Sequence, residues 1–477
     1  MQNKLLNICG GVTLLFCVLI SFDIFPFLRG PAPYPPDWQW EYFFINTLEK
    51  IWLPVAVIWV ILIFSYYLER KTEMHIQKHE SKILFCLICL FFLFQLSITF
   101  FSRAGIGVLL ARIIHPDMNG YFTAAIQIHD VSSFLKTFNA TVLSFPMHAQ
   151  GHPPGAILFF WVIEQIFRPI SFFFGFLNNI SLSHSDIAQI WKGLTISQKT
   201  TALITGLFIP FLSTFTSLFV YYIGKKLYGI RVGIRAACIS ISIPSFIFFI
   251  PLNDVFLPLF PLSSFYCFVR GLSEEKPSLL FLSGVIFSAG LFFSISLLPL
   301  LFLFGMYLVW RREIKIIFQN GPIFFLGMLP IPLSLFLYGY NTLLVFQTLL
   351  RGLPENRAYL TWVFFNVSDF FIFLGIPLFF FFMILLCKYI GITIGLQLKK
   401  IDPLTIGTIG MITLLDVSGS VRGEVARIWL PMYPFFVLSS IFFMTKTLRI
   451  QRKGFVLILF LQFVQVLFMQ EFWVMLW

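Results

Sequence analysis

The sequence predicts an all-α protein that crosses a membrane many times, because it is rich in apolar residues, poor in charge and divided into long uncharged runs. Hydrophobic residues make up 58% of the 477 residues, and charged residues only 11%. Water-soluble domains carry about 25% charged residues. The composition therefore excludes a soluble enzyme, a disordered chain and a nucleic-acid-binding protein. The net charge of +12 is instead expected from basic cytoplasmic loops.

The predicted transmembrane helices number about thirteen, each formed by a run near the roughly 20 apolar residues that one helix needs to cross a bilayer. We expect the first run to be an uncleaved anchor, because no small-residue cleavage site follows it. The apolar stretch 279–310 is too long for one span and is flanked by basic residues, so it predicts a hairpin of two short spans. In chain order the runs are 5–22, 51–67, 83–101, 201–223, 236–250, 255–269, 279–296, 297–310, 323–338, 370–387, 404–415, 428–445 and 455–477.

Lysine and arginine gather in the segments that we expect to face the cytoplasm, since cytoplasmic loops carry an excess of both. These segments are 70–82, 225–235, 311–315, 388–400 and 446–453, together with Lys276. The N-terminus is then cytoplasmic. The segments left on the outer face are 23–50, 102–199, 251–254, 339–369 and 416–427.

One apolar run does not fit this alternation of sides. Counting 155–177 as a span would place the basic segment 225–235 outside, and the run contains Glu164, Arg168 and Pro169. Charged residues are costly next to lipid, so we expect a re-entrant or interfacial helix here and an ordered outer loop over 102–199. The chain then divides into an N-terminal pair of spans with an outer loop (1–82), a core with the large outer loop (83–310) and C-terminal spans with outer loops 339–369 and 416–427 (311–477).

The large outer loop holds the first candidate site residues. Four of the seven histidines of the chain lie between residues 102 and 154. Asp117 sits in His-Pro-Asp-Met-Asn-Gly-Tyr-Phe, where Pro and Gly favour a short turn. Asp130 follows thirteen residues later, and for this residue a local helix-cap bond or a pair with Lys136 is the alternative to a functional role.

Two histidines follow in Met-His-Ala-Gln-Gly-His-Pro-Pro-Gly, residues 147–155. The prolines open the next helix and hold His152 at the membrane boundary. His152 and His148 are candidates to bind a phosphate, orient a carboxylate or ligate a metal, and interfacial packing is the alternative for both. A divalent metal therefore stays open as a cofactor.

Two further outer segments carry charge at the edge of the membrane. Asp254 lies between two apolar runs, where it is a candidate substrate ligand or a helix cap. The segment 416–427 contains Arg422, Glu424 and Arg427 among small residues. Paired guanidinium groups bind phosphate oxygens well, and anchoring to lipid headgroups is the alternative.

These motifs together resemble the multi-spanning GT-C glycosyltransferases, near the branch of the protein O-mannosyltransferases and lipid A aminoarabinose transferases. The resemblance rests on Gly-His-Pro-Pro-Gly at 151–155, on Asp254 after a Lys-Lys-Leu-Tyr-Gly turn, and on Gly-Glu-Val-Ala-Arg-Ile-Trp-Leu-Pro from residue 423. Segment 29–40 also resembles a stretch of some bacterial members. The matches are short and spread over most of the chain.

The resemblance implies an inverting transfer of a sugar from a polyprenyl-phosphate carrier to a glycan, lipid or protein acceptor on the outer face of a bacterial plasma membrane. It implies Asp117 as the general base, with Asp130 as the second choice. In the family the acidic pair usually follows the first span, whereas here the large loop follows the third, so Asp23, Asp37 and Glu41 are alternative bases. The expected roles of the other candidates are donor-phosphate binding for Arg422, Arg427 and His152, and substrate binding for His148, Asp254 and Glu424.

Other function classes remain alternatives to a transferase. A lipid-linked polysaccharide polymerase or ligase would use a similar outer-face site. A transporter or flippase suits the composition equally well, but transporters often show a two-fold internal repeat, which this sequence lacks.

Overall fold

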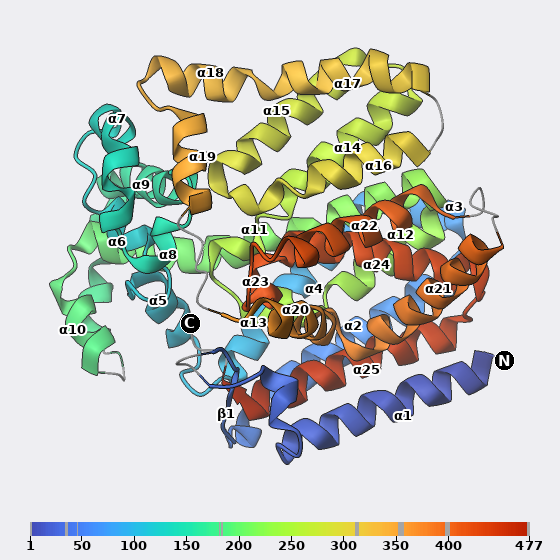
Figure 1. The fold of residues 1–477 in the computed structure, drawn as a ribbon. Coiled ribbons are helices and arrows are strands. Elements are labelled where there is room, and N and C mark those ends of the chain that lie inside the picture. The colour runs from blue at the N-terminus through green and yellow to red at the C-terminus, as the bar shows by residue number, and fades with distance from the viewer. Residues whose placement is uncertain are drawn as a thin grey trace.

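The chain folds into a bundle of long helices with a group of shorter helices across one end, as the computed structural model shows in Figure 1. The structure describes residues 2–474 except 34–36, 45, 181, 183–184, 311–313, 352–356 and 396–400. Within these residues the only strands are β1 (Glu41–Tyr42) and β2 (Trp473–Val474), which pair antiparallel. The predicted all-α polytopic class is confirmed.

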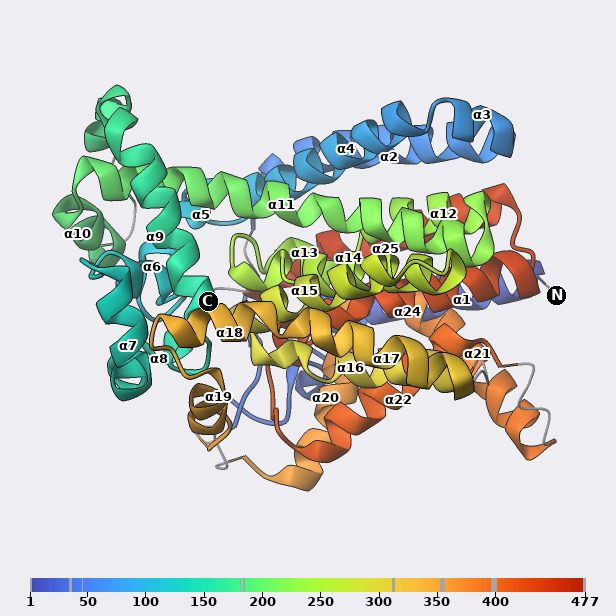
Figure 2. The same cartoon turned by 90° about the horizontal axis from the view of Figure 1, so that it is seen from above.

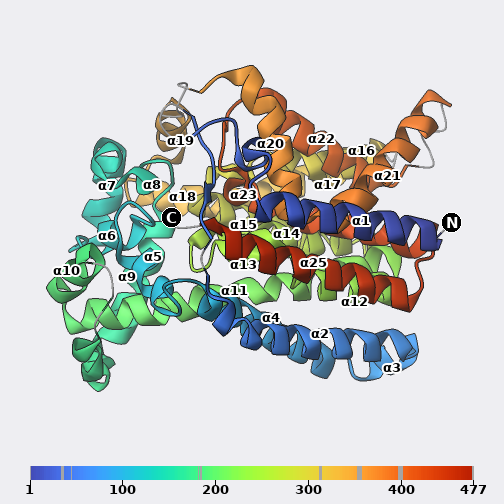
Figure 3. The same ribbon diagram turned by 90° about the horizontal axis from the view of Figure 1, so that it is seen from below.

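The helices of the bundle run roughly side by side (Figures 1 and 3). They are α1 (Gln2–Ser21), α2 (Trp52–Arg70), α4 (Glu80–Phe101), α11 (Ile196–Tyr228), α12 (Ile230–Ser240), α13 (Pro244–Phe248), α14 (Leu259–Ser273), α15 (Pro277–Phe293), α16 (Leu300–Trp310), α17 (Ile314–Met328), α18 (Pro330–Leu337), α20 (Tyr359–Leu374), α21 (Ile376–Ile394), α22 (Pro403–Ser418), α24 (Tyr433–Phe442) and α25 (Arg452–Phe472).

The shorter helices lie at the two ends of the bundle. The helical cap, defined as α5 to α10, consists of α5 (Gly107–Ile114), α6 (Tyr121–Ala125), α7 (Val131–Thr141), α8 (Met147–Gln150), α9 (Gly155–Phe167) and α10 (Ser185–Gly193). Near it lies α19 (Thr342–Arg351), whereas α3 (Glu73–Lys78) lies at the opposite end (Figure 2). The short helix α23 (Val425–Ile428) precedes α24. One longer 3-10 segment, η4 (Arg168–Asn179), follows α9. Short turns complete the fold: η1 (Pro26–Arg29), η2 (Leu48–Lys50), η3 (Val142–Ser144), η5 (Asn253–Val255), η6 (Ile295–Leu297), η8 (Leu430–Met432) and the π-turn η9 (Phe443–Thr447).

Nine helices in the described part of the chain are long and apolar enough to cross a membrane, and four shorter ones are also apolar. The nine include 155–179, the segment for which we expected a re-entrant or interfacial helix. There α9 gives way to the tighter turns of η4, with a kink at Phe174. Figure 2 shows α9 running across the end of the bundle rather than along it, which is the direction of an interfacial helix.

The sequence-based boundaries fail in one region that matters for the site. Segment 339–369 was expected to be an outer loop, with a span from 370, whereas α20 runs from Tyr359 to Leu374 and ends at Gly375. The φ of +104° at Gly375 suits glycine, and Pro377 starts the next helix. The sequence analysis did not predict α20 because the helix contains polar residues, including Asn366 and Asp369. These side chains hydrogen-bond to another loop instead of facing lipid.

The basic segments meet at the end of the bundle that holds the N-terminus. Arg235 pairs with Glu69 at 2.7 Å, and Lys225 pairs with Glu80. Figure 2 shows this end opposite to the helical cap. The predicted orientation requires that arrangement, because basic loops face the cytoplasm.

The longest helix links the two ends. Helix α11 has 33 residues, about 50 Å at 1.5 Å per residue, and so exceeds the roughly 30 Å of a hydrocarbon core. It begins with a capping box, in which Thr195 and Gln198 each accept a hydrogen bond from the backbone of the other. It ends at Gly229, beyond which α12 turns back along it.

Close packing of α11 on α12 depends on two glycines. A Cβ atom on Gly224 would lie 2.8 Å from the Cα of Gly233. Small residues at such crossings let membrane helices approach closely. We predict that Gly224→Val lowers the free energy of unfolding by about 1–3 kcal/mol, because the added methyl groups force α11 and α12 apart.

The measurement is thermal unfolding of the purified protein in detergent. Gly305→Val in α16 is the matched control, since a Cβ there meets no atom within 4 Å. Equal melting temperatures for the two variants would contradict the packing argument.

Candidate functional site

A cluster of polar side chains forms where the helical cap meets the end of the bundle. Its members come from three distant parts of the chain: the large loop, the η5 turn and the segment before α24. They are Tyr121, His148, His152, Asp254, Glu424 and Arg427.

Arg427 is the centre of this cluster. Its guanidinium donates to Glu424 at 2.9 Å, lies 4.0 Å from a carboxylate oxygen of Asp254, and contacts Nδ1 of His148 at 3.4 Å. Burial acts to lower the pKa of Arg427, but Glu424 and Asp254 outweigh it and the pKa is raised. The guanidinium therefore stays charged although little of it is exposed. Its Nε has no hydrogen-bond partner among the described residues.

The backbone around Arg427 is fixed by two helices. The carboxylate of Asp369 in α20 accepts from the backbone N–H of Ala426 at 3.0 Å and from the indole N–H of Trp40 at 2.7 Å. The hydroxyl of Ser245 in α13 donates to the carbonyl of Ala426. A peptide unit held from both sides leaves the Arg427 side chain little freedom of direction.

The glycines just before Arg427 let the chain turn sharply. Gly419 and Gly423 have φ of +61° and +97°, and Glu424 itself has φ +58°, a conformation that costs energy for a residue with a Cβ. Asn366 holds this turn, because its amide accepts from the N–H of Gly423 at 3.0 Å and donates to the carbonyl of Val421 at 2.9 Å.

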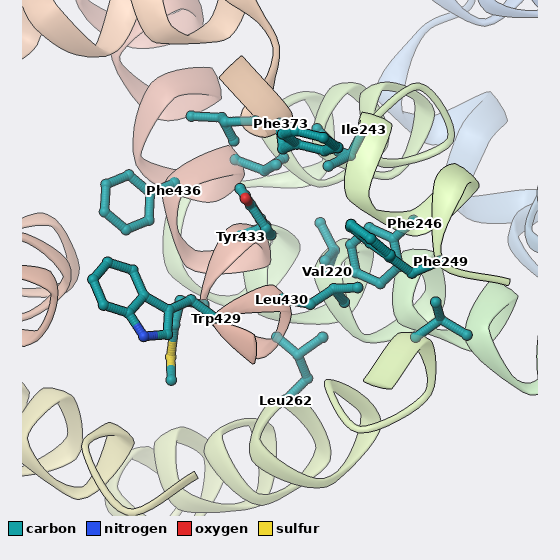
Figure 4. Packing of buried hydrophobic residues seen from close by; sticks show 14 of the residues in the cluster. Val220, Ile243, Phe246, Phe249, Leu262, Phe373, Trp429, Leu430, Tyr433 and Phe436 are labelled. Carbon is teal, nitrogen blue, oxygen red and sulfur yellow. The ribbon is translucent and has the colours of Figure 1, made fainter. Parts of the chain in front are cut away.

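Behind Arg427 the chain enters the apolar core. Figure 4 shows Trp429, Leu430 and Tyr433 among buried residues of neighbouring helices, including Phe246 and Leu262. The ring of Tyr433 also stacks on Phe370 in α20, with 4.3 Å between the ring centres. The site is therefore anchored to the buried core of the bundle.

Both histidines of the 147–155 motif reach the cluster. The ring of His152 meets Tyr121 edge-on, with 5.3 Å between ring centres. Burial lowers the pKa of His152, which Asp254 opposes. Burial, followed by the charge of Arg427, lowers the pKa of His148 to about 3. At neutral pH both rings are therefore uncharged, and each offers one N–H donor.

Asp117 lies beside the cluster, on the turn that leads into α6. Gly120 has φ +71°, and a Cβ there would lie 2.8 Å from a side-chain carbon of Pro146, so the turn packs on the residue that precedes α8. The backbone of Asp117 hydrogen-bonds to the ring of His148. The Asp117 side chain is exposed, and its carboxylate oxygens have no hydrogen-bond partner among the described residues.

Asp130 and Arg422 are placed differently from the other candidates. The Asp130 carboxylate caps α7 by accepting from the N–H of Ser133 at 2.7 Å, and this bond lowers its pKa. The guanidinium of Arg422 donates to the backbone carbonyls of Arg357 and Gly419 and lies over the ring of Tyr359. Their expected roles in catalysis and in phosphate binding stay predictions.

Two of the three alternative bases in the first loop have side-chain partners, and the third, Glu41, is exposed. Asp23 makes two hydrogen bonds to Arg29, at 2.7 and 2.8 Å. Asp37 accepts from the indole of Trp362 at 2.8 Å. Glu41 lies in β1. None of these contacts joins the cluster around Arg427.

Several residues of the site escaped the sequence analysis. Tyr121 belonged to the motif that contains Asp117, so its position next to Asp117 was a usable signal. Asp369 and Asn366 hydrogen-bond to backbone groups more than 50 positions away in the chain. No local sequence pattern predicts such a contact. The described residues contain no group of three or more His, Cys, Asp or Glu side chains arranged to hold a metal ion.

The lowered pKa values give the site a dependence on pH. A histidine has a pKa near 6.5 in the unfolded chain, so the folded state binds fewer protons between that value and about 3. The contribution is fully present above pH 6.5 and is lost as the pH falls. We predict that His148→Gln makes the melting temperature fall less steeply than in the wild type between pH 6.5 and 5.

Thermal unfolding in detergent across this pH range is the measurement. His129→Gln, at an exposed position of the same loop, is the control and should keep the wild-type slope. A wild-type slope in His148→Gln as well would mean that His148 is protonated in the folded protein.

Comparison with known proteins adds one finding. The model of the dolichyl-phosphate-mannose-protein mannosyltransferase family matches residues 189–340, which run from α10 to the end of α18 and include Asp254. No curated protein and no solved structure gives a match. The match and the all-helical polytopic fold together support a membrane glycosyltransferase of the GT-C type.

Proposed function

We propose that this glycosyltransferase moves a sugar from a polyprenyl-phosphate carrier to an acceptor hydroxyl, with inversion and with Asp117 as the general base. The carrier is suggested by the matched family, whose name gives dolichyl-phosphate-mannose, a sugar on a polyprenyl-type phosphate, as the donor. One observation carries the proposal: an exposed carboxylate without a hydrogen-bond partner among the described residues lies beside a buried cluster of one guanidinium and two neutral imidazoles.

The proposed base suits its role because it is accessible. A general base must lie within hydrogen-bonding reach of the proton that it accepts. The carboxylates of Glu424 and Asp254 face Arg427, and those of Asp23 and Asp37 are occupied by Arg29 and Trp362. Asp117 has lone pairs available to an incoming hydroxyl.

The reaction needs only one proton transfer. The acceptor hydroxyl gives its proton to Asp117 while its oxygen forms the bond to the anomeric carbon. The bond from that carbon to the phosphate oxygen breaks, and its electron pair leaves with the polyprenyl phosphate. Attack from the face opposite the leaving group inverts the anomeric centre, and the weakly basic phosphate requires no acid.

The cluster supplies groups for the donor. Arg427 and the N–H of His152 would stabilise the charge that grows on the phosphate, because preorganised donors in a dry site act strongly on developing charge. Asp254 and Glu424 would keep Arg427 charged and accept hydrogen bonds from sugar hydroxyls, with His148 beside them.

The proposed side of the membrane follows from the basic segments. These segments and the cluster lie at opposite ends of the bundle, so the rule that basic loops face the cytoplasm supports an outer-face site. The resemblance to bacterial members of the superfamily supports a bacterial plasma membrane.

The first test removes the proposed base. Asp117→Asn should lower the turnover roughly 100- to 10,000-fold at unchanged protein abundance, because asparagine keeps the shape but accepts no proton. The measurement is the transfer of radiolabel from polyprenyl-phosphate sugars in isolated membranes, with identification of the product. A single added unit supports a transferase, and a ladder of chain lengths would support a polymerase.

Asp130→Asn is the matched control for this test. It changes the same group in the same loop, and asparagine caps a helix about as well as aspartate, so activity should fall little. An Asp117→Asn protein that keeps more than roughly a tenth of the wild-type turnover would reject Asp117 as the base.

The second test concerns the phosphate. We predict that Arg427→Lys raises the KM for the lipid donor by about tenfold, because lysine keeps the charge but loses the paired hydrogen bonds of a guanidinium. Donor titrations in nanodiscs measure the effect. Arg422→Lys is the comparison variant and should change KM less, since Arg422 bonds to backbone carbonyls. Unchanged kinetics for both would favour simple interfacial anchoring.

A further inference from the structure

A cavity of about 550 Å³ lies between the first loop and the end of the bundle, and none of its lining residues belongs to the Arg427 cluster. Four separate parts of the chain line it: the first loop within 23–33 and 39–43, the 98–112 region at the junction of α4 and α5, residues 247–250 at the end of α13, and residues 470–474 at the end of α25. Its volume lies within the range of small-molecule pockets, about 300–1,000 Å³.

The wall of the cavity carries more positive than negative side chains. The described lining contains three arginines (Arg29, Arg103 and Arg112) and two carboxylates (Asp23 and Glu41). Asp23 and Arg29 neutralise each other through their two hydrogen bonds. The remaining lining groups, two guanidinium groups and one exposed carboxylate, leave a positive wall.

Arg112 is held deep in this wall. Its guanidinium donates to the carbonyl oxygens of Phe248, at 2.7 Å, and Ile250, which fixes it against the backbone next to η5. Burial lowers its pKa only to about 10, so it is charged at neutral pH. Arg103 is exposed and lies over the ring of Phe43, 5.2 Å from its centre.

Aromatic residues form the apolar part of the wall. Trp40, Tyr42, Phe43 and Trp473 line the cavity, and the neighbouring Phe44 has a half-exposed side chain. Tryptophan and other aromatic residues gather where lipid headgroups meet the hydrocarbon. The cavity lies at the ends of α4 and α25, two helices that are long and apolar enough to cross a membrane.

We propose that this cavity binds the phosphate headgroup of an anionic membrane lipid, with Arg103 and Arg112 as its cationic ligands. The fork of a guanidinium matches phosphate oxygens in pairs, and the aromatic rim would cover the glycerol and the start of the acyl chains. The site is separate from the proposed transfer reaction, and its test does not depend on activity.

The probe is phosphatidylglycerol, titrated into the protein in a neutral detergent and followed by native mass spectrometry. Phosphatidylcholine, whose headgroup has no net charge, is titrated in parallel. We expect selective binding of phosphatidylglycerol, and binding roughly tenfold weaker in Arg103→Gln, because a hydrogen bond to a charged group is lost. Arg168→Gln is the matched control, since Arg168 is also exposed but begins η4 and does not line the cavity.

A second variant fills the cavity without changing its charge. Ala104→Trp adds an indole to a lining residue and should weaken the binding of phosphatidylglycerol as well. Equal binding of the two lipids, an unchanged affinity in Arg103→Gln, or an unchanged affinity in Ala104→Trp would each overturn the proposal.

Soluble glycerol 3-phosphate separates a lipid ligand from a free phosphate. Weak competition by this headgroup, compared with phosphatidylglycerol, supports a membrane lipid. If glycerol 3-phosphate binds as tightly as the lipid, the acyl chains contribute nothing and the cavity takes a soluble anion instead.

Discussion

The surrounding structure depends on one constraint: the charge of Arg427 is buried and must be balanced. Removing a guanidinium from water is costly unless carboxylates lie close to it and the geometry is fixed. Glu424 supplies one such group from the same turn and Asp254 another from η5, more than 170 positions earlier in the chain. The need to bring these groups together ties the C-terminal helices to the core and to the loop that holds His148.

That constraint explains why an irregular segment is held so firmly. Residues 419–428 contain three positive φ angles and little regular structure. Their backbone groups are satisfied by side chains of α20, with Asn366 and Asp369 bonded to Gly423 and Ala426. Non-helical backbone at the edge of a membrane persists only when protein or water satisfies its polar groups. The polar side chains of α20 therefore stabilise the bend that orients Arg427.

The sequence was informative about the fold wherever a helix faces lipid. The runs 5–22, 51–67, 83–101 and 201–223 became α1, α2, α4 and α11, because lipid selects the uninterrupted apolar stretch that composition reveals. Helix α20 was not predicted because its polar side chains hydrogen-bond to another segment and interrupt the apolar pattern. Within the site, the motif residues His148, His152, Asp254, Glu424 and Arg427 converge, since each was a titratable group at a membrane boundary. The contacts that orient them join positions far apart in the chain, such as Trp40 and Asp369, and no local pattern encodes such pairs.

The pairing of β1 with β2 sets an order on folding during synthesis. The carboxylate of Glu471 accepts hydrogen bonds from Thr47, 424 positions earlier. At about 5–20 residues per second, a ribosome needs roughly 20 to 90 s to make the intervening chain. Throughout that interval β1 has no partner strand, and an unpaired strand edge is a template for wrong pairing. The wall lined by Trp473 can close only after β2 has been made. A nascent chain arrested before α25 would contain most of its helices but would leave β1 without its partner strand.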